Sequence, residues 1–459
     1  MTRSTALTIF VLALLLRLAY FGIVIPQQTN LYMPDSPLYE TLADDMVASG
    51  GFNHKMTEGF VAETERVPVY VAYLAAFRTF LGTSPVWPVL GQCVLDALTC
   101  LLIGYLAAQF HRDLALLAGL LAACNLNLIV HAGLILADSL FLLPFTAHLV
   151  LMVRYIQRPT ARDALWAGVF FALALLTRSV LLYFALVLPV AILIIAWRRD
   201  VGWAQTGRAV VACLVPLVVL VGPLLIRNAN EYGHFSLTSQ GGTHALYWVV
   251  PLAREFARGV PFAQTQDEMR RRVDLQYRQQ GLPGQPQNPF EVSRQHMEVA
   301  KLALQEMSIG EVTWAWSAGA MLNLFSPSLS AVPLVRNMER TRFYEVAGGS
   351  PMEKVWNFLS RSSSSSYLAW MIPAIVLAVV VRGVLVWGIL CGAGRRLIAG
   401  DALLYLLAVG LYILAITGPV VGVKYRLPLE PLLILLTAVG LHCLFSGARG
   451  WAAFLQRAR

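Results

Sequence analysis

The chain has 459 residues, of which 57% are hydrophobic and 13% are charged. Roughly a quarter of the residues in a soluble domain are charged, so this composition excludes an ordinary soluble protein. The formal net charge of +9 does not indicate a nucleic-acid partner, because the basic residues cluster in short loops between apolar runs. The six cysteines lie in apolar runs without paired spacing, which indicates neither a disulfide framework nor a zinc site.

Apolar segments of about 20 residues recur along the whole chain, and a bilayer accepts spanning backbone only as helix or closed barrel. The sequence therefore predicts an all-α polytopic transmembrane bundle of about 10–11 spans with amphipathic juxtamembrane helices. The first segment is too long for a signal peptide and is expected to be retained. The predicted spans cover residues 6–25, 86–110, 114–134, 139–156, 164–177, 179–197, 209–226, 367–391, 402–419 and 429–445.

Clustered arginines predict which loops are cytoplasmic. These arginines are Arg154, Arg158 and Arg162; Arg198, Arg199 and Arg208; Arg395 and Arg396; and Arg449, Arg457 and Arg459. Alternating sides along the chain then places loop 26–85 outside. The same alternation places Asp138, Arg178, Arg227 and Arg426 on that outer face.

Three regions follow from this topology. Residues 1–226 form an N-terminal transmembrane catalytic module that includes external loop 26–85. Residues 227–366 form an external cap, and residues 367–459 form the C-terminal transmembrane helices. The apolar run 312–325 is predicted as a re-entrant or surface-lying helix. If it spans the membrane instead, every later loop changes sides.

The stretch 33–68 organises the external face. Between Pro37 and Gly50, the apolar residues Leu38, Leu42 and Met46 recur every four positions, which predicts an amphipathic helix on the membrane surface, ended by the glycine. The following run, 69–81, is too short to span and is predicted to be a juxtamembrane helix.

Asp35 is the leading candidate for catalysis, because it stands within ten residues of a span end in a rigid Pro34-Asp35-Ser36-Pro37 approach. The alternative is that Asp35 or Ser36 only caps the surface helix, with Pro37 as its first residue.

Arg66 ends the same loop, in Glu65-Arg66-Val67-Pro68. A guanidinium gives bidentate hydrogen bonds to phosphate and keeps its charge, which suits it to hold a phosphate leaving group. Anchoring to a lipid headgroup is the alternative.

Asp138 lies between two apolar spans, where an ionised group is costly unless it is paired or wet. It is expected either to join Asp35 or to cap the helix that follows. Further outer-face cations could form a positive pocket for a lipid-linked phosphate together with Arg66; these are Arg178, Arg227, Lys424 and Arg426.

Taken together, these motifs resemble bacterial GT-C glycosyltransferases of the protein-mannosyltransferase and aminoarabinose-transferase type. The elements that carry the resemblance are Asp35-Ser36-Pro37-Leu38-Tyr39, Glu65-Arg66-Val67-Pro68-Val69-Tyr70, Gln92, Leu176-Thr177-Arg178, the string from Ile226-Arg227-Asn228 to Gly241-Gly242, and Lys424-Tyr425-Arg426-Leu427-Pro428. They cover nearly the full chain in the family's order, and the Arg-Asn string and the Tyr-Arg-Leu-Pro element are the most specific.

The resemblance implies an enzyme that transfers a sugar from a polyprenyl phosphate to a lipid, glycan or protein acceptor outside the membrane. It implies contact between Arg66 and the donor phosphate with Glu65 alongside, and catalytic roles for Asp35, Asp138 and Glu65. Asp138 stands where glutamate is frequent in the family. No sizeable soluble domain follows the last predicted span, so acceptor recognition is expected of residues 227–330.

The expected mechanism is a single in-line displacement that inverts the anomeric carbon, with Asp35 taking the acceptor proton and Arg66 neutralising the phosphate. A divalent metal is not indicated by the sequence, and its need is left open. A transporter or flippase for a lipid-linked or anionic substrate is the alternative, although no internal repeat is visible. A non-catalytic scaffold would leave the acid–base cluster without a purpose.

Overall fold

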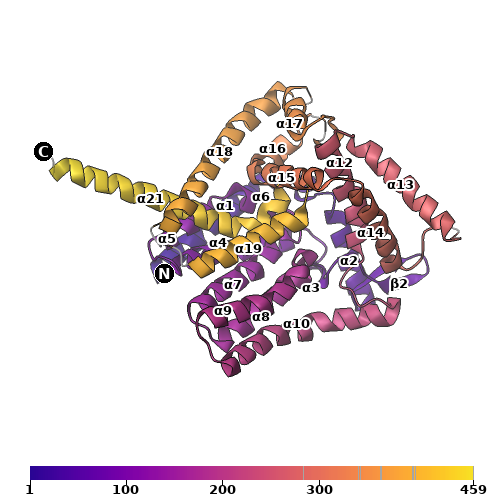
Figure 1. Cartoon of the computed structure of the whole chain (residues 1–459), viewed down its shortest axis with the longest axis horizontal. Coiled ribbons are helices and arrows are strands. Elements are labelled where there is room, and N and C mark those ends of the chain that lie inside the picture. The colour runs from indigo at the N-terminus through magenta and orange to yellow at the C-terminus, as the bar shows by residue number, and fades with distance from the viewer. Residues whose placement is uncertain are drawn as a thin grey trace.

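The computed structural model describes residues 1–457 except 283, 340, 342, 362, 363, 395, 396, 398 and 399. The predicted cytoplasmic pair Arg395 and Arg396 and the terminal Arg459 therefore lie outside the described residues. The described part is an all-α bundle with a single two-stranded sheet, which confirms the predicted fold class (Figure 1).

Eight described helical segments are long and apolar enough to cross a membrane, and a bent pair would make a ninth. The fifth predicted span, 164–177, corresponds to α8 (Ala161–Thr177), which has 17 residues and is shorter than these. The eight segments are Arg3–Val24 (α1), Val86–Ala108 (α4), Asp138–Gln157 (α7), Ser179–Arg198 (ending in α9), Trp203–Tyr232 (α10), Ser366–Cys391 (in α18), Gly400–Thr417 (α19) and Val423–Ser446 (α20 and most of α21).

The bent pair consists of α5 (Leu114–Ala123) and α6 (Leu126–Ala132), which meet at 51°. A break inside a bilayer frees backbone carbonyls that must find donors within the protein. Arg17 supplies such a donor, because its guanidinium donates to the Ala123 carbonyl at 2.9 Å. The same guanidinium pairs with Asp96 at 2.6 Å, and both charged side chains are fully buried. The break is thereby stabilised and directs α6 toward the loop that precedes α7.

Loop 26–85 contains two helices where the sequence predicts them, and a hairpin that the sequence did not predict. Helix α2 (Ser36–Ser49) ends at Gly50, whose φ of 69° is the left-handed conformation that favours glycine. Helix α3 (Pro68–Leu81) begins with proline at its first position. Between them, β1 (Asn53–Met56) pairs antiparallel with β2 (Gly59–Ala62), with Asn53 opposite Ala62.

The region after α10, which the sequence predicts to be an external cap, is helical, and its helices α12, α13 and α14 lie at the end of the molecule away from both chain termini (Figure 1). A buried ion pair between Lys354 and Glu255, at 2.5 Å, ties α17 to α12. The cap helices are α11 (Gln240–His244), α12 (Val250–Arg258), α13 (Phe262–Gln279) and α14 (Pro289–Gln305), followed by α15 (Ile309–Phe325), α16 (Pro333–Arg336) and α17 (Pro351–Ser360).

Helix α15 contains the run 312–325 and connects the cap to the transmembrane helices. Near its start, the Trp314 indole donates to the Phe256 carbonyl of α12 at 3.1 Å. Further along, the Trp316 indole donates to the Ala415 carbonyl of α19 at 3.0 Å. Helix α15 is not among the described helices that are long and apolar enough to span, and it links the two parts of the protein through side-chain contacts.

Candidate active site

Asp35 lies at the N-cap position of α2, but its side chain makes no capping hydrogen bond. Ser36 fixes the loop instead. Its hydroxyl donates to the Ile135 carbonyl at 2.8 Å and accepts the Met33 N–H at 2.9 Å. The Ile135 N–H also donates to the Leu31 carbonyl at 2.9 Å. These bonds join the loop before α2 to the loop before α7, and they leave the Asp35 carboxylate available for other partners.

Those partners are two cations from distant parts of the chain. Lys424 Nζ lies 2.8 Å from one carboxylate oxygen of Asp35, and Arg66 Nη2 lies 3.5 Å from the other. Burial alone would raise the pKa of the Asp35 carboxyl, yet Lys424 and Arg66 outweigh burial and hold that pKa below its ordinary value. Asp35 is therefore ionised at neutral pH, and its side chain remains 37% exposed.

Arg66 is only partly satisfied. Its Nη2 faces Asp35, while its Nε and Nη1 are buried and have no hydrogen-bond partner among the described residues. The guanidinium also lies over the ring of Tyr39, 5.7 Å from the ring centre. A buried donor left without an acceptor costs about 1–3 kcal/mol, so two such nitrogens on one cation favour an anionic ligand at this position.

The loop that carries Arg66 is shaped by Glu63, which the sequence analysis did not single out as a site residue. A carboxylate oxygen of Glu63 accepts the backbone N–H groups of Glu65, at 2.6 Å, and of Arg66, at 2.9 Å. The Glu65 side chain, predicted to be catalytic, is exposed, and the described residues provide no hydrogen bond or ion pair to it. The feature of the sequence that could have identified Glu63 is that it is a second acid in this loop, two positions before Glu65.

Arg227 braces this loop from α10. Its guanidinium donates to the Phe52 carbonyl at 2.9 Å, to the Glu63 carbonyl at 2.5 Å and to the Asn228 side chain at 2.8 Å. The Ser239 N–H donates to the Thr64 carbonyl at 2.8 Å. The string that begins at Arg227 thus holds the Arg66 loop in place, and the Arg227 donors point at protein carbonyls rather than at Asp35.

Asp138 and Arg178 form a second ion pair. Asp138 is the first residue of α7 and is buried, and Arg178 directly follows α8 with its guanidinium over the Phe141 ring, 5.8 Å from its centre. Arg178 also contributes to the lowered pKa of Asp35, so the two ion pairs are neighbours. The structure therefore brings Asp35, Arg66, Asp138, Arg178 and Lys424 together.

Arg426 behaves differently from Lys424, two residues earlier. Its Nε donates to Glu430 at 2.8 Å, its Nη1 to the Ser326 carbonyl at 2.5 Å and its Nη2 to the Ser328 hydroxyl at 2.7 Å. The side chain is buried. Every nitrogen of this guanidinium has an acceptor within the protein, so Arg426 fixes α20 and thereby presents Lys424 to Asp35.

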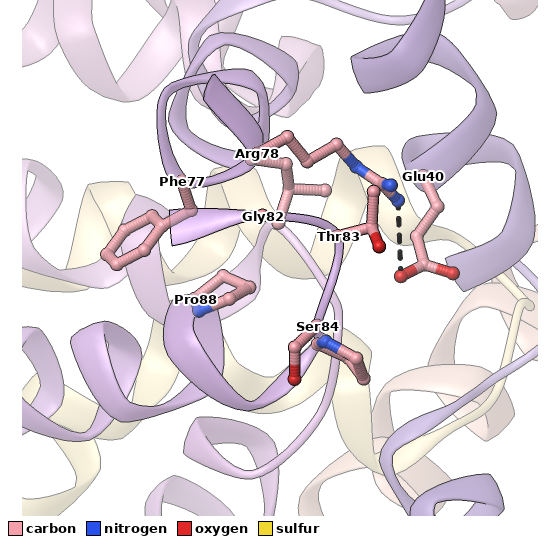
Figure 2. Close-up of a pocket in the computed structure, with 9 residues that line it drawn as sticks. Glu40, Phe77, Arg78, Gly82, Thr83, Ser84 and Pro88 are labelled. Carbon is pink, nitrogen blue, oxygen red and sulfur yellow. Dashed lines mark ion pairs between the residues drawn. The ribbon is translucent and has the colours of Figure 1, made fainter. Parts of the chain in front are cut away.

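A separate small cavity lies between α2, α3 and the start of α4 (Figure 2). Its volume of about 10 Å³ has room for about one water molecule. Arg78, which lines it, already pairs with Glu40 at 3.4 Å and with Asp44 at 2.7 Å. This cavity is not a second phosphate site.

The described residues contain no group of three or more histidine, cysteine, aspartate or glutamate side chains arranged to hold a metal ion. Asp35 and Asp138, the two carboxylates of the cluster, each face a cation. What the arrangement offers chemically is one ionised carboxylate beside a cation with unpaired donors.

Comparison with known proteins gives a partial family match and solved structures with a similar fold. Residues 66–226 match the family model described as dolichyl-phosphate-mannose-protein mannosyltransferase. The structure of the oligosaccharyltransferase of Archaeoglobus fulgidus in the apo form aligns with 100% of the chain at a TM-score of 0.55 and 12% identity. The chain shares the fold of this oligosaccharyltransferase.

A second structure of the GT-C oligosaccharyltransferase AglB from Archaeoglobus fulgidus, in complex with an inhibitory peptide and a dolichol-phosphate, aligns with 99% of the chain at a TM-score of 0.52 and 12% identity. The chain spans about half the length of both, at 52%. ArnT from Cupriavidus metallidurans bound to undecaprenyl phosphate aligns over 98% of this chain and 80% of its own, with 16% identity and a TM-score of 0.38. No curated protein sequence matches the chain significantly.

Proposed function

We propose that the chain is an integral-membrane glycosyltransferase that moves a sugar from a polyprenyl-phosphate donor to an acceptor at the extracytoplasmic face. The observation that carries this proposal is the pairing of an ionised, partly exposed Asp35 with Arg66, whose Nε and Nη1 are buried without partners in the described chain. A base and a site for an anionic leaving group thereby lie side by side. The match of residues 66–226 to a mannosyltransferase family supports the same reading.

In the proposed reaction, the acceptor hydroxyl attacks the anomeric carbon of the sugar in line with the bond to phosphate. The new bond joins the acceptor oxygen to the anomeric carbon, the bond from that carbon to the phosphate oxygen breaks, and the proton moves to Asp35. The lipid leaves as a phosphate monoester, whose added charge Arg66 and Lys424 neutralise. One displacement of this kind inverts the anomeric centre.

The remaining predicted site residues receive supporting roles. Asp138 orients Arg178, which adds positive charge beside Asp35. Arg227 and Arg426 act as positioning residues, because their donors are engaged with Glu63, Phe52, Glu430 and backbone carbonyls. Glu65 is left without a catalytic role, because its side chain is exposed and the described chain offers it no ionic partner.

The proposed placement of the site rests on the distribution of arginines along the chain. The arginine-rich loops 154–162 and 198–208 are assigned to the cytoplasm, which puts Asp35 and Arg66 on the opposite side of the inner (plasma) membrane. A polyprenyl-phosphate donor and the acceptor would both reach the cluster from that side.

The test is an assay of the purified full chain in lipid with a panel of sugars linked to undecaprenyl phosphate. Because every transfer releases undecaprenyl phosphate, its release on addition of an envelope extract as acceptor reports activity whatever the sugar. Acceptor-dependent release with sugar incorporation supports the proposal. Movement of the intact lipid across the bilayer without bond cleavage would contradict it and favour a transporter. Repeating the assay with a chelator shows whether a divalent metal is needed.

A further inference from the structure

Asp35 and the proposed donor phosphate compete for the same cations. Both oxygens of the Asp35 carboxylate face a positive group, Lys424 at 2.8 Å and Arg66 at 3.5 Å. Lys424 and Arg66 are also the groups placed to receive a phosphate, since two buried nitrogens of Arg66 have no partner among the described residues and the Lys424 side chain is 31% exposed. In the free protein these cations weaken Asp35 as a base, because a carboxylate that is held ionised has little tendency to take a proton.

We propose that the donor phosphate takes Lys424 and Arg66 away from Asp35 when it binds, so that the carboxylate becomes an effective base only in the donor complex. This proposal rests on the function proposed above. It assigns Lys424 two successive partners, Asp35 before donor binding and phosphate after it, and it orders the reaction with the donor first and the acceptor second.

The charge of the cluster is consistent with this exchange. The charged groups that face Asp35 come from three elements: Arg66 before α3, Arg178 after α8 and Lys424 in α20; Asp138 pairs with Arg178. The phenol of Tyr39, on α2, has a pKa raised by burial and stays neutral. Three cations against two carboxylates leave one net positive charge. A sugar-linked phosphodiester carries one negative charge and would make the cluster neutral.

The same balance holds through the reaction. When the sugar leaves, the phosphate becomes a monoester and gains a negative charge, and Asp35 gains the acceptor proton. The cluster therefore stays neutral from the donor complex to the product complex. Proton uptake by Asp35 compensates for the charge that develops on the phosphate, at a site where an uncompensated charge would be costly.

The experiment measures the affinity of undecaprenyl phosphate for the purified full chain in detergent. Asp35→Asn removes the competitor for both cations, so binding should become about tenfold tighter than in the wild type. Asp44→Asn is the matched control, because it removes the same charge from the same helix at a residue paired with Arg78, and it should leave the affinity unchanged. Equal or weaker binding by Asp35→Asn would overturn the proposal.

Lys424→Gln completes a double-mutant cycle. If Lys424 is the shared cation, the gain from Asp35→Asn should fall to less than about threefold in the Lys424→Gln background. An undiminished gain would show that Lys424 is not shared. Thermal unfolding of each variant establishes that it is folded.

A second measurement follows proton uptake instead of affinity. At about pH 5, above the lowered pKa of free Asp35, wild-type protein should take up more protons on binding undecaprenyl phosphate than Asp35→Asn does, as measured by calorimetry in two buffers. Equal uptake would overturn the exchange. These readouts record binding and not sugar transfer. If the binding results are as expected but no sugar is transferred, the proposed enzyme is rejected and the exchange of cations stands. If sugar is transferred but the binding results differ from those expected, the exchange is rejected and the enzyme stands.

Discussion

Two charged clusters stand within a few residues of each other in α20 and α21, and they differ in how far their hydrogen bonds are satisfied. In the buried cluster, Arg426 and Glu430 are 4% and 2% exposed, and both Glu430 oxygens also accept amide donors from Asn125 and Asn127. In the outer cluster, Lys424 and Asp35 are 31% and 37% exposed, and Arg66 has two unpaired donors in the described chain. The first cluster is complete without a ligand, and the second is not.

This contrast separates structural charges from functional ones that look alike in the sequence. A buried ion pair whose remaining donors and acceptors are engaged holds helices together, and removing one partner leaves an uncompensated charge. A partly exposed pair contributes little stability, so the outer cluster is the better candidate for a role in binding or chemistry.

The largest effect is expected from Asp35→Asn. Loss of the base should lower the rate of sugar transfer by about 10²–10⁴-fold while the protein still binds undecaprenyl phosphate. Undecaprenyl phosphate release under saturating donor measures the rate. An Asn variant with wild-type turnover would remove Asp35 from the chemistry.

The buried cluster should respond in stability instead. Arg426→Met leaves Glu430 buried without its cation, which should lower the free energy of unfolding by about 3–5 kcal/mol and visibly lower the melting temperature in detergent. Lys424→Met is the control from the outer cluster, and it should change stability by less than about 1 kcal/mol. Similar losses in the two variants would erase the distinction between the clusters.

Arg66→Lys keeps the charge of the outer cluster and removes the fork of donors. Because a lysine gives a point charge where the guanidinium gives a bidentate contact, affinity for undecaprenyl phosphate should fall about 10–100-fold. Binding titrations of Arg66→Lys and Arg66→Gln measure this. Retention of full affinity in Arg66→Gln would show that the phosphate binds elsewhere.

The smallest effect concerns pH. The pKa of Asp35 is lower in the folded protein than its ordinary value of 3.8, so its ion pairs stabilise the fold at neutral pH and lose this contribution as the pH falls through the folded pKa. Since the side chain is 37% exposed, the contribution should stay below about 1 kcal/mol. Melting temperatures of wild type and Asp35→Asn should therefore converge below about pH 4. A constant difference would show that Asp35 is not stabilised as an anion.

Much of the fold could be predicted from the sequence, because membrane spans and the amphipathic α2 have periodicities that a single chain reveals. The approximate convergence of Asp35, Arg66, Asp138 and Lys424 on one face followed from counting spans. The sequence could not show that Arg426 and Arg227 turn to carbonyls, because those acceptors belong to residues such as Ser326 and Glu63 that come near only in the folded chain.

The sequence could not separate the roles of Glu63 and Glu65 for a similar reason. The two acids stand two positions apart in one irregular loop, and only the backbone path decides which carboxylate turns inward to accept N–H groups. The hairpin of β1 and β2 was missed because its four-residue strands carry little alternation of apolar and polar residues.

The central claim is that Arg66 and Lys424 receive a lipid-linked phosphate beside Asp35. A structure of the full chain determined with bound undecaprenyl phosphate tests it most directly. We expect phosphate oxygens within about 3 Å of Arg66 Nε or Nη1 and of Lys424 Nζ, with Lys424 withdrawn from Asp35. A phosphate bound away from Arg66, with the contact between Lys424 and Asp35 unchanged, would contradict the account.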